Sequence, residues 1–146
     1  MLKLTRKADY GLIAMRHLAA ARRDEAHSAK DIADLYSIPQ EALAKILQKL
    51  AKAGLLTSLQ GTNGGYTLAR EAREISALEV IQAIDGPLFL TSCSSSKCGG
   101  CSQTERCTVR EPLRRVSRTI EEVLGQLSIH DLTESAEAKH VELVKL

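Results

Sequence analysis

The sequence lacks any apolar run that approaches the roughly 20 residues needed to span a membrane. Its opening stretch, MLKLTRKADYGL, also lacks the apolar stretch of a secretion signal. These absences predict a cytoplasmic protein with no membrane association.

Cysteine is absent except within CSSSKCGGCSQTERC, residues 93–107, which contains all four cysteines of the chain. In the reducing cytoplasm, clustered cysteines hold metal more often than they form disulfides. No His/Ser/Asp or nucleotide-binding motif accompanies them, so we expect the protein not to be an enzyme.

With 146 residues, the chain is long enough to bury the core of one domain without help from its cysteines. Its formal net charge of +2 is unevenly distributed. Residues 1–70 carry 11 Lys and Arg against 6 Asp and Glu, or +5, whereas residues 71–146 carry 9 against 12, or −3. An uneven solvated surface would have the same pattern, but the basic front half favours a polyanion as partner.

Two helices are predicted before the first proline. The first covers residues 5–22, with apolar side chains at helical spacing and with Arg16 and Arg22 outward. The second is short and starts after Ser28, because Ser28 and Asp31 have the spacing of a capping box in which Asp replaces the usual Glu.

A third helix is predicted in SIPQEALAKILQKLAKAGLL, where Pro39 can open it and Gly54 can end it. Its apolar face has four members: Leu43, Ile46, Leu47 and Leu50. Its opposite face is polar and basic: Gln40, Glu41, Lys45, Gln48, Lys49 and Lys52. Two short helices separated by the tight YSI joint, the second with a basic face, indicate a helix-turn-helix.

A short hairpin is predicted directly after this motif. LLTSL and YTLAR alternate like strands, and QGTNGG between them contains the turn pair Asn63-Gly64. A hairpin behind a basic helix-turn-helix predicts a winged helix. REISALEVIQAIDGP then follows as a further helix that stops at Gly86-Pro87.

After the cysteines, apolar residues recur at alternating steps of four and three: Val109, Leu113, Val116, Ile120, Val123 and Leu127. This two-position heptad seam favours pairing between two chains over packing within one domain. A homodimer also suits a helix-turn-helix, because two half-sites are then read together. Beyond about residue 132, TESAEAKHVE is typical of a loosely held tail.

These elements predict a mainly α protein: a winged helix-turn-helix with a two-stranded β wing, followed by a long dimerisation helix. We expect four parts in order. They are a DNA-binding domain over residues 1–86, a cysteine-rich loop over 87–108, a dimerisation helix over 109–132 and a polar tail over 133–146.

This order of parts resembles the IscR/NsrR/RirA superfamily of bacterial winged-helix regulators, the Rrf2 family. The likeness covers roughly residues 1–130 and is carried by LTRKADYGL, ALAKILQKLAKAGLL, GTNGGYTLAR and ISALEVIQAIDGP, followed by the cysteine loop and the long helix. It implies a DNA-binding transcriptional repressor that senses iron, redox or nitric oxide status through an iron–sulfur cluster. Two alternatives stay open: a cluster-free regulator controlled by thiol oxidation or a partner protein, and a DNA-binding protein clipped by zinc.

The cysteines are soft ligands suited to iron–sulfur clusters, zinc and copper(I). Their spacing, C-x4-C-x2-C-x5-C, contains one short pair, whereas a structural zinc site usually has two. The resemblance implies Cys93, Cys101 and Cys107 as cluster ligands. Cys98 is then either a replacement for Cys93 or a nearby reactive thiol.

A fourth ligand is needed beside three thiols. IscR-like members place a histidine three residues after the last cysteine, but Arg110 stands there and a guanidinium cannot coordinate a metal. NsrR-like members use an acidic residue near the start of the first helix, supplied by the other subunit, and Asp9 occupies that place. All four cysteines together, or His130, are alternatives. Three thiols with a carboxylate resemble a 4Fe–4S site in relatives, which we favour over 2Fe–2S.

Contacts with duplex DNA are expected from the third predicted helix, from the wing and from the start of the first helix. Three lysines are expected to contact phosphates without reading sequence: Lys45, Lys49 and Lys52. Three further side chains of the same helix are expected to reach base edges: Gln40, Glu41 and Gln48. By resemblance, the wing enters the minor groove with a tip that lacks a basic residue: Gln60, Gly61, Thr62 and Asn63. Thr5 and Arg6 are expected to touch backbone phosphates.

Overall fold

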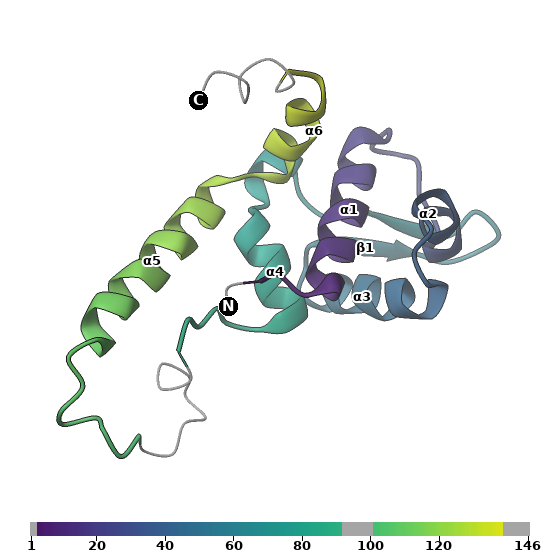
Figure 1. Cartoon of the computed structure of the whole chain (residues 1–146). Helices are drawn as coiled ribbons and strands as arrows, with labels where there is room; N and C mark the ends of the chain where they lie inside the picture. The colour runs from purple at the N-terminus through teal and green to yellow at the C-terminus, as the bar shows by residue number, and fades with distance from the viewer. Residues whose placement is uncertain (1–2, 92–100, 139–146) are drawn as a thin grey trace.

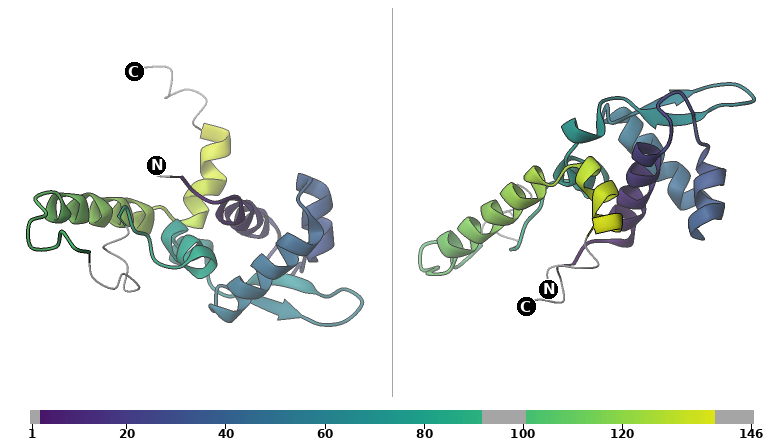
Figure 2. Two further views of the ribbon diagram at one scale, coloured as in Figure 1. Left: turned by 60° about the horizontal axis from the view of Figure 1, so that its bottom comes forward. Right: turned by 90° about the horizontal axis from the view of Figure 1, so that it is seen from above.

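The computed structural model describes residues 3–91 and 101–138, with side chains as far as residue 134. Its elements follow in chain order: α1 (Arg6–Ala20), α2 (Ala29–Tyr36), α3 (Gln40–Lys52), β1 (Leu56–Leu59), β2 (Gly65–Leu68), the short 3₁₀ helix η1 (Ala72–Glu74), α4 (Ala77–Asp85), α5 (Arg110–Gln126) and α6 (Ile129–Ala138). The expected mainly helical winged architecture is therefore confirmed. The wing and α5 lie at opposite ends of the molecule (Figures 1 and 2). None of the described helices is long and apolar enough to cross a membrane.

Local side-chain caps determine where four of the described helices begin: α1, α2, α4 and α6. Four helices start after a hydroxyl residue whose oxygen accepts the backbone N–H three residues later, in the pairs Thr5–Ala8, Ser28–Asp31, Ser76–Glu79 and Ser128–Asp131. The capping box predicted at Ser28 is confirmed, since the Asp31 carboxylate also accepts the Ser28 N–H. Such caps satisfy N–H groups that have no partner within the helix.

The helix-turn-helix consists of α2 and α3. Ser37 ends α2 in the left-handed conformation, with φ of 54°, and the Ile38 N–H then donates to the Ala33 carbonyl at 2.9 Å. The predicted apolar face of α3 is confirmed, because all four members are buried: Leu43, Ile46, Leu47 and Leu50. This packing leaves the opposite face of α3 exposed to solvent.

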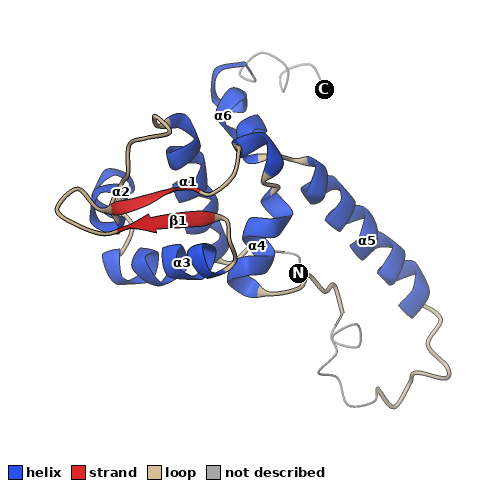
Figure 3. Ribbon diagram, turned by 180° about the vertical axis from the view of Figure 1, so that it is seen from behind, coloured by secondary structure: helices blue, strands red, loops and turns tan. Residues whose placement is uncertain are grey.

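The wing is the predicted hairpin. Strands β1 and β2 pair antiparallel from Leu56↔Leu68 to Leu59↔Gly65, and they lie side by side at the edge of the molecule away from α5 (Figure 3). His27 extends the pairing, since its N–H and carbonyl exchange hydrogen bonds with Tyr66 at 3.2 and 2.8 Å. The segment between α1 and α2 is thereby fastened to the wing.

The core is centred where α1, α3 and α4 meet at Gly11. A Cβ atom on Gly11 would lie 2.2 Å from Ile84 Cδ1 and 3.4 Å from Ile46 Cγ2, so a larger residue here requires the Ile84 side chain to shift. Gly11 is buried, and both isoleucines belong to the apolar core. The start of α1 and the last turn of α4 are therefore packed against the middle of α3.

The first helix differs from its prediction in two respects. It ends at Ala20 rather than at residue 22. Arg16 was expected to point outward, but it is half-buried and its Nε donates to the Leu132 carbonyl at 3.0 Å. The reason is tertiary: α6 folds back onto α1 and brings a carbonyl to the arginine. Hydropathy alone assigns a charged residue to solvent.

The single helix expected over residues 109–132 is instead two helices. α5 ends at Gln126, and the backbone of Leu127 and Ile129 bonds to that of Ala77 and Ile75, each at 2.8 Å. Ser128 then caps α6 with Asp131, a capping box that heptad spacing does not report. The start of the expected polar tail, as far as residue 138, belongs to α6. The boundaries of the four expected parts otherwise stay predictions.

The apolar seam of α5 is divided between two environments. None of its residues is fully buried. Leu113, Ile120 and Leu127 are half-buried, and α5 packs along α4. The alternating valines are the outward half: Val109, Val116 and Val123, which are 57%, 48% and 61% exposed. One helix thus packs on its own chain and also presents an apolar stripe.

Replacing Ser128 with alanine should destabilise the protein, because α6 loses its N-cap. We expect a loss of about 1 kcal/mol in the free energy of unfolding and a Tm lowered by about 2–4 °C, measured by thermal and urea unfolding. Ser117→Ala is the matched control, since the buried Ser117 hydroxyl has no hydrogen-bond partner among the described residues. Equal destabilisation by the two variants would contradict the assigned cap.

Candidate functional site

The exposed face of α3 carries every side chain that the sequence predicts on the recognition helix. All six are exposed: Gln40, Glu41, Lys45, Gln48, Lys49 and Lys52. The apolar face on the other side of α3 is buried in the core, so these polar side chains point toward solvent. Lys49 makes an additional contact, because its Nζ donates to the Ile84 carbonyl at 3.1 Å. This carbonyl takes one of the three donors of the ammonium group.

The position of α2 relative to α1 is supported by a cluster of three rings. His17 Nδ1 lies 3.1 Å from Tyr36 Oη, and His17 Nε2 lies 3.2 Å from His27 Nδ1. The two histidine rings meet edge to face with centroids 4.7 Å apart. Because His27 is also bridged to Tyr66, the cluster connects α1, α2 and the wing.

Burial lowers the pKa of His17 below its ordinary value. The neighbouring His27 lowers it further, while the carboxylate of Glu25 acts in the opposite direction. Both ring nitrogens of His17 have a hydrogen-bonding partner, Tyr36 Oη and His27 Nδ1, and each contact holds a single proton. A second charge in this cluster is therefore unfavourable.

The tip of the wing presents three exposed polar side chains: Gln60, Thr62 and Asn63. The turn is held by the Gly64 N–H, which donates to the Gly61 carbonyl at 3.0 Å. Gly61 has φ of +116°, and a Cβ on Gly64 would lie 2.5 Å from the Leu59 carbonyl oxygen. Both glycines favour the turn, and for Gly64 this agrees with its expected place in the turn pair Asn63-Gly64.

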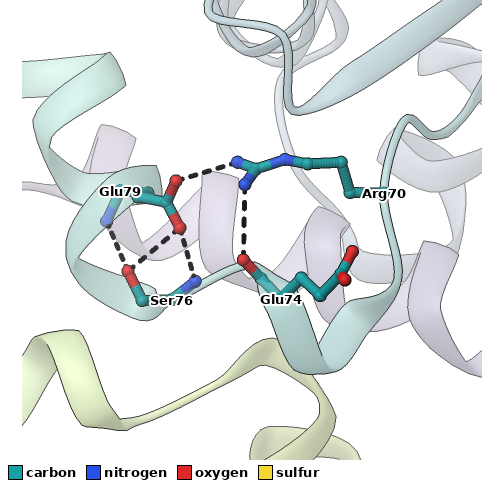
Figure 4. A network of polar contacts seen from close by, with 4 residues as sticks. All are labelled: Arg70, Glu74, Ser76 and Glu79. Carbon is teal, nitrogen blue, oxygen red and sulfur yellow. Dashed lines mark hydrogen bonds and ion pairs between the residues drawn. The ribbon is translucent and has the colours of Figure 1, made fainter.

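Arg70 lies at the base of the wing, where its guanidinium forms an ion pair with Glu79 of α4. Its Nη2 donates to Glu79 Oε1 at 2.8 Å, and Glu79 Oε2 accepts the Ser76 N–H at 2.9 Å (Figure 4). Burial raises the pKa of Glu79, but the hydrogen bonds from Arg70 and Ser76 outweigh it and leave the pKa lowered. The guanidinium thus orients the wing relative to α4.

The start of α1 is tied to the end of α4. Thr5 Oγ1 accepts the Ala8 N–H at 3.1 Å and donates to Asp85 Oδ2 at 2.6 Å. Arg6 and Asp9 are exposed on the first turn of the helix. Sequence reasoning missed the role of Asp85, and no local signal could have found it, because the pair is separated by 80 residues.

The cysteine segment is only partly within the described residues. Cys101 is exposed and Cys107 is half-buried, and both are free thiols. Cys93 and Cys98 lie outside the described ranges. Within residues 3–91 and 101–138, no three His, Cys, Asp or Glu side chains converge as a metal site. His130 lies in α6, with its Nε2 2.9 Å from Glu134 Oε1. Two accessible soft thiols in one short segment are chemically suited to a cluster or to zinc.

The arrangement defines a winged helix-turn-helix protein with a projecting helix behind it, the class of a DNA-binding regulator. The model of the Rrf2 family, described as iron-dependent transcriptional regulators, matches residues 4–135. The chain belongs to this family. It is a transcriptional regulator, and members of the family are not enzymes.

Relatives with known names agree with this assignment. The chain is 31% identical over 131 residues to the HTH-type transcriptional regulator NsrR of Shouchella clausii, covering 90% of this chain and 88% of that protein. It is 31% identical over 140 residues to the HTH-type transcriptional regulator IscR of Xenorhabdus nematophila, covering 96% and 84%.

Solved structures of similar proteins share the fold. T. potens IscR superposes with a TM-score of 0.74 at 31% identity, covering 93% of this chain and 89% of that one. CymR, the global cysteine regulator of B. subtilis, superposes with a TM-score of 0.72 at 28% identity, covering 92% and 98%. The fold is therefore shared by regulators with different names.

Lowering the pH should destabilise the protein through His17. Folding lowers the pKa of His17, so the unfolded chain binds more protons than the folded one near pH 6. The stabilisation is complete above about pH 6.5 and is lost as the pH falls through the pKa of the folded state. Urea unfolding between pH 5.5 and 7.5 measures this slope. It avoids the acidic range in which Asp31 and Glu79, whose pKa values are also lowered, titrate.

His17→Gln should flatten the slope in this window, because the variant has one titrating group fewer. A single proton accounts for at most about 1.4 kcal/mol per pH unit. A variant with the wild-type slope would show that the cluster does not titrate with folding.

Proposed function

We propose that this protein is a DNA-binding transcriptional repressor that senses iron, redox or nitric oxide status through an iron–sulfur cluster. The observation that carries the proposal is the grouping of all four cysteines in residues 93–107, directly between the winged module and α5. The likeness to NsrR and IscR supports it. So does the family description as iron-dependent regulators.

Cys93, Cys101 and Cys107 are the proposed thiolate ligands, and Asp9 of the second subunit is the proposed fourth ligand. The exposure of Asp9 and Cys101 fits this role, because both side chains are accessible to another chain. Cys98 is an alternative thiol. When bound, the cluster supplies an iron centre that responds to oxidants and nitric oxide; we favour 4Fe–4S over 2Fe–2S.

Recognition of operator DNA is assigned to α3 and the wing. Gln40, Glu41 and Gln48 reach base edges, and Lys45, Lys49 and Lys52 contact phosphates. Thr5 and Arg6 contact phosphates from α1. The wing tip contributes Gln60, Thr62 and Asn63 as uncharged minor-groove contacts. Thr5 has one O–H donor, which is given to Asp85 Oδ2, so a phosphate contact from this hydroxyl requires that hydrogen bond to be released.

The last turn of α4 is the proposed connection between sensing and DNA binding. The chain runs from this turn into the cysteine segment. The turn receives hydrogen bonds from Thr5 of α1, through Asp85, and from Lys49 of α3, through the Ile84 carbonyl. A displacement of the chain after Gly86 therefore moves the supports of both DNA-contacting helices. A ligand biases DNA binding only by favouring one of two such arrangements.

A cluster-free regulator of the same fold is the second candidate. The specific observation that favours it is the structural similarity to CymR, the global cysteine regulator of B. subtilis. In that case Cys98 and Cys101 act as a thiol pair, or a partner protein controls the regulator. A zinc clip is the third outcome of the same experiment.

Protein purified without oxygen from iron-replete cells should be brown and contain iron and sulfide. Cys101→Ser and Cys107→Ser should abolish the colour, because each removes a ligand. Asp9→Ala should shorten the lifetime of the visible absorption in air while leaving the far-ultraviolet circular dichroism unchanged. Asp24→Ala is the matched control, since Asp24 is also an exposed aspartate but lies beyond the end of α1.

The other outcomes distinguish the candidates. Colourless protein with bound zinc would show that the cysteines hold a structural zinc ion instead of an iron–sulfur cluster. Colourless, metal-free protein whose DNA affinity changes on thiol oxidation would support the cluster-free regulator. A wild-type lifetime for Asp9→Ala would remove Asp9 from the ligand set.

The homodimer is proposed to form through the exposed valines of α5. Val116→Asp should weaken dimerisation, because it places a charge in the middle of the apolar stripe. Loss of one buried valine contributes about 1.5–3 kcal/mol, so we expect a dimer dissociation constant at least about tenfold higher, measured by sedimentation velocity. Arg118→Asp on the same helix, away from the seam, is the control. Wild-type assembly of Val116→Asp would exclude this surface as the interface.

A further inference from the structure

A cleft of ≈ 400 Å³ lies between the start of α1, the exposed face of α3 and the end of α4. Three lysines line it: Lys7, Lys45 and Lys49. Its remaining walls are largely apolar and include Ile46 and Ile84, with Glu41 as the one acidic side chain. The sequence pattern did not assign Lys7 to DNA. Several cations lie near the start of α1, and their spacing does not single out Lys7.

The lysines of this cleft are available to an anion. Lys7 and Lys45 are exposed, and neither side chain forms an ion pair or hydrogen bond with any residue that the structure describes. Lys49 is held by the neutral Ile84 carbonyl, which leaves its charge and its other donors unused. With Glu41 ionised, the cleft carries three positive charges and one negative charge. A net positive cleft lined by ammonium donors is suited to a phosphate group.

We propose that this cleft binds a backbone phosphate of duplex DNA and that Lys7 is a DNA-contacting residue. The inference rests on the DNA-binding part of the proposed function and extends it to α1. A recognition helix in the major groove has a phosphate backbone on either side, and the cleft occupies one side of α3. Its lysines hold that strand in place. Base edges are left to Gln40 and Gln48, which do not line the cleft, and to Glu41, which does.

The cleft is better suited to DNA than to a small free anion. Its ammonium groups are on exposed side chains, so salt and water screen their attraction for a single ion. A DNA strand brings a row of phosphates and releases condensed counterions on binding, which makes the same contacts favourable. The apolar walls add no second donor set that would enclose a small molecule.

Fluorescence anisotropy with a labelled, mixed-sequence 30-base-pair duplex tests the assignment over a series of KCl concentrations. Such a duplex is suitable because phosphate contacts do not depend on the operator sequence. Lys7→Gln should reduce the slope of log K against log salt by about 0.9 for each cleft that engages DNA, and should weaken binding several-fold at low salt. Lys7→Arg should retain most of the slope because the charge is kept.

Arg73→Gln is the matched control, since it removes one positive charge from an exposed residue of η1, away from α3. Equal changes in slope for Lys7→Gln and Arg73→Gln would overturn the proposal, because net charge alone would then explain both. An unchanged slope for Lys7→Gln beside a steep wild-type slope would also overturn it, and would leave the proposed function intact. Wild-type protein that does not bind duplex DNA would reject the proposed function itself.

Inorganic phosphate distinguishes DNA from a free anion. Replacing chloride with phosphate at constant ionic strength should leave the affinity for the duplex nearly unchanged. Displacement of the duplex by millimolar phosphate from wild-type protein, but not from Lys7→Gln, would assign the cleft to a small anion and overturn the DNA-backbone assignment.

Discussion

The architecture depends on the crossing of α1, α3 and α4 at Gly11, where the Ile84 side chain packs directly against the glycine backbone. Protein interiors are packed so closely that one of three such helices cannot move without the others. The same turn of α4 also receives the Thr5 hydroxyl, through Asp85, and the Lys49 ammonium. One turn therefore positions the first helix and the recognition helix, and the chain leaves it toward the cysteine segment.

This constraint explains how the functional surfaces are separated. The polar face of α3, the wing and the start of α1 surround the packed crossing, whereas α5 projects from the opposite end (Figures 1 and 2). The wing is fixed at its base by Arg70 and Glu79, and α2 is fixed by the rings of His17 and Tyr36. With these internal supports, the surface proposed to read DNA is expected to move as a unit. Regulation then requires a change in the support, which is the role proposed for the end of α4.

Much of the fold could be predicted because its signals are local. The apolar face of α3, the capping box at Ser28 and the Asn63-Gly64 turn each depend on residues within one turn or one hairpin. The sequence Ser-Ile-His-Asp at residue 128 contained an equally local signal for α6, which the stronger heptad pattern concealed. The predicted DNA contacts on α3 and the wing tip are all exposed, but exposure alone does not separate phosphate contacts from base contacts.

The sequence by itself determined where helices begin, which faces are apolar and that the cysteines are grouped, because each depends on the spacing of neighbouring residues. Only the tertiary structure decided where α5 ends, that Arg16 is half-buried beneath α6 and that the valines form the exposed half of the seam. It also brought Lys7 to the same cleft as Lys45. These features require contacts between segments far apart in the chain, and residue spacing along one helix carries no information about what another helix places against it.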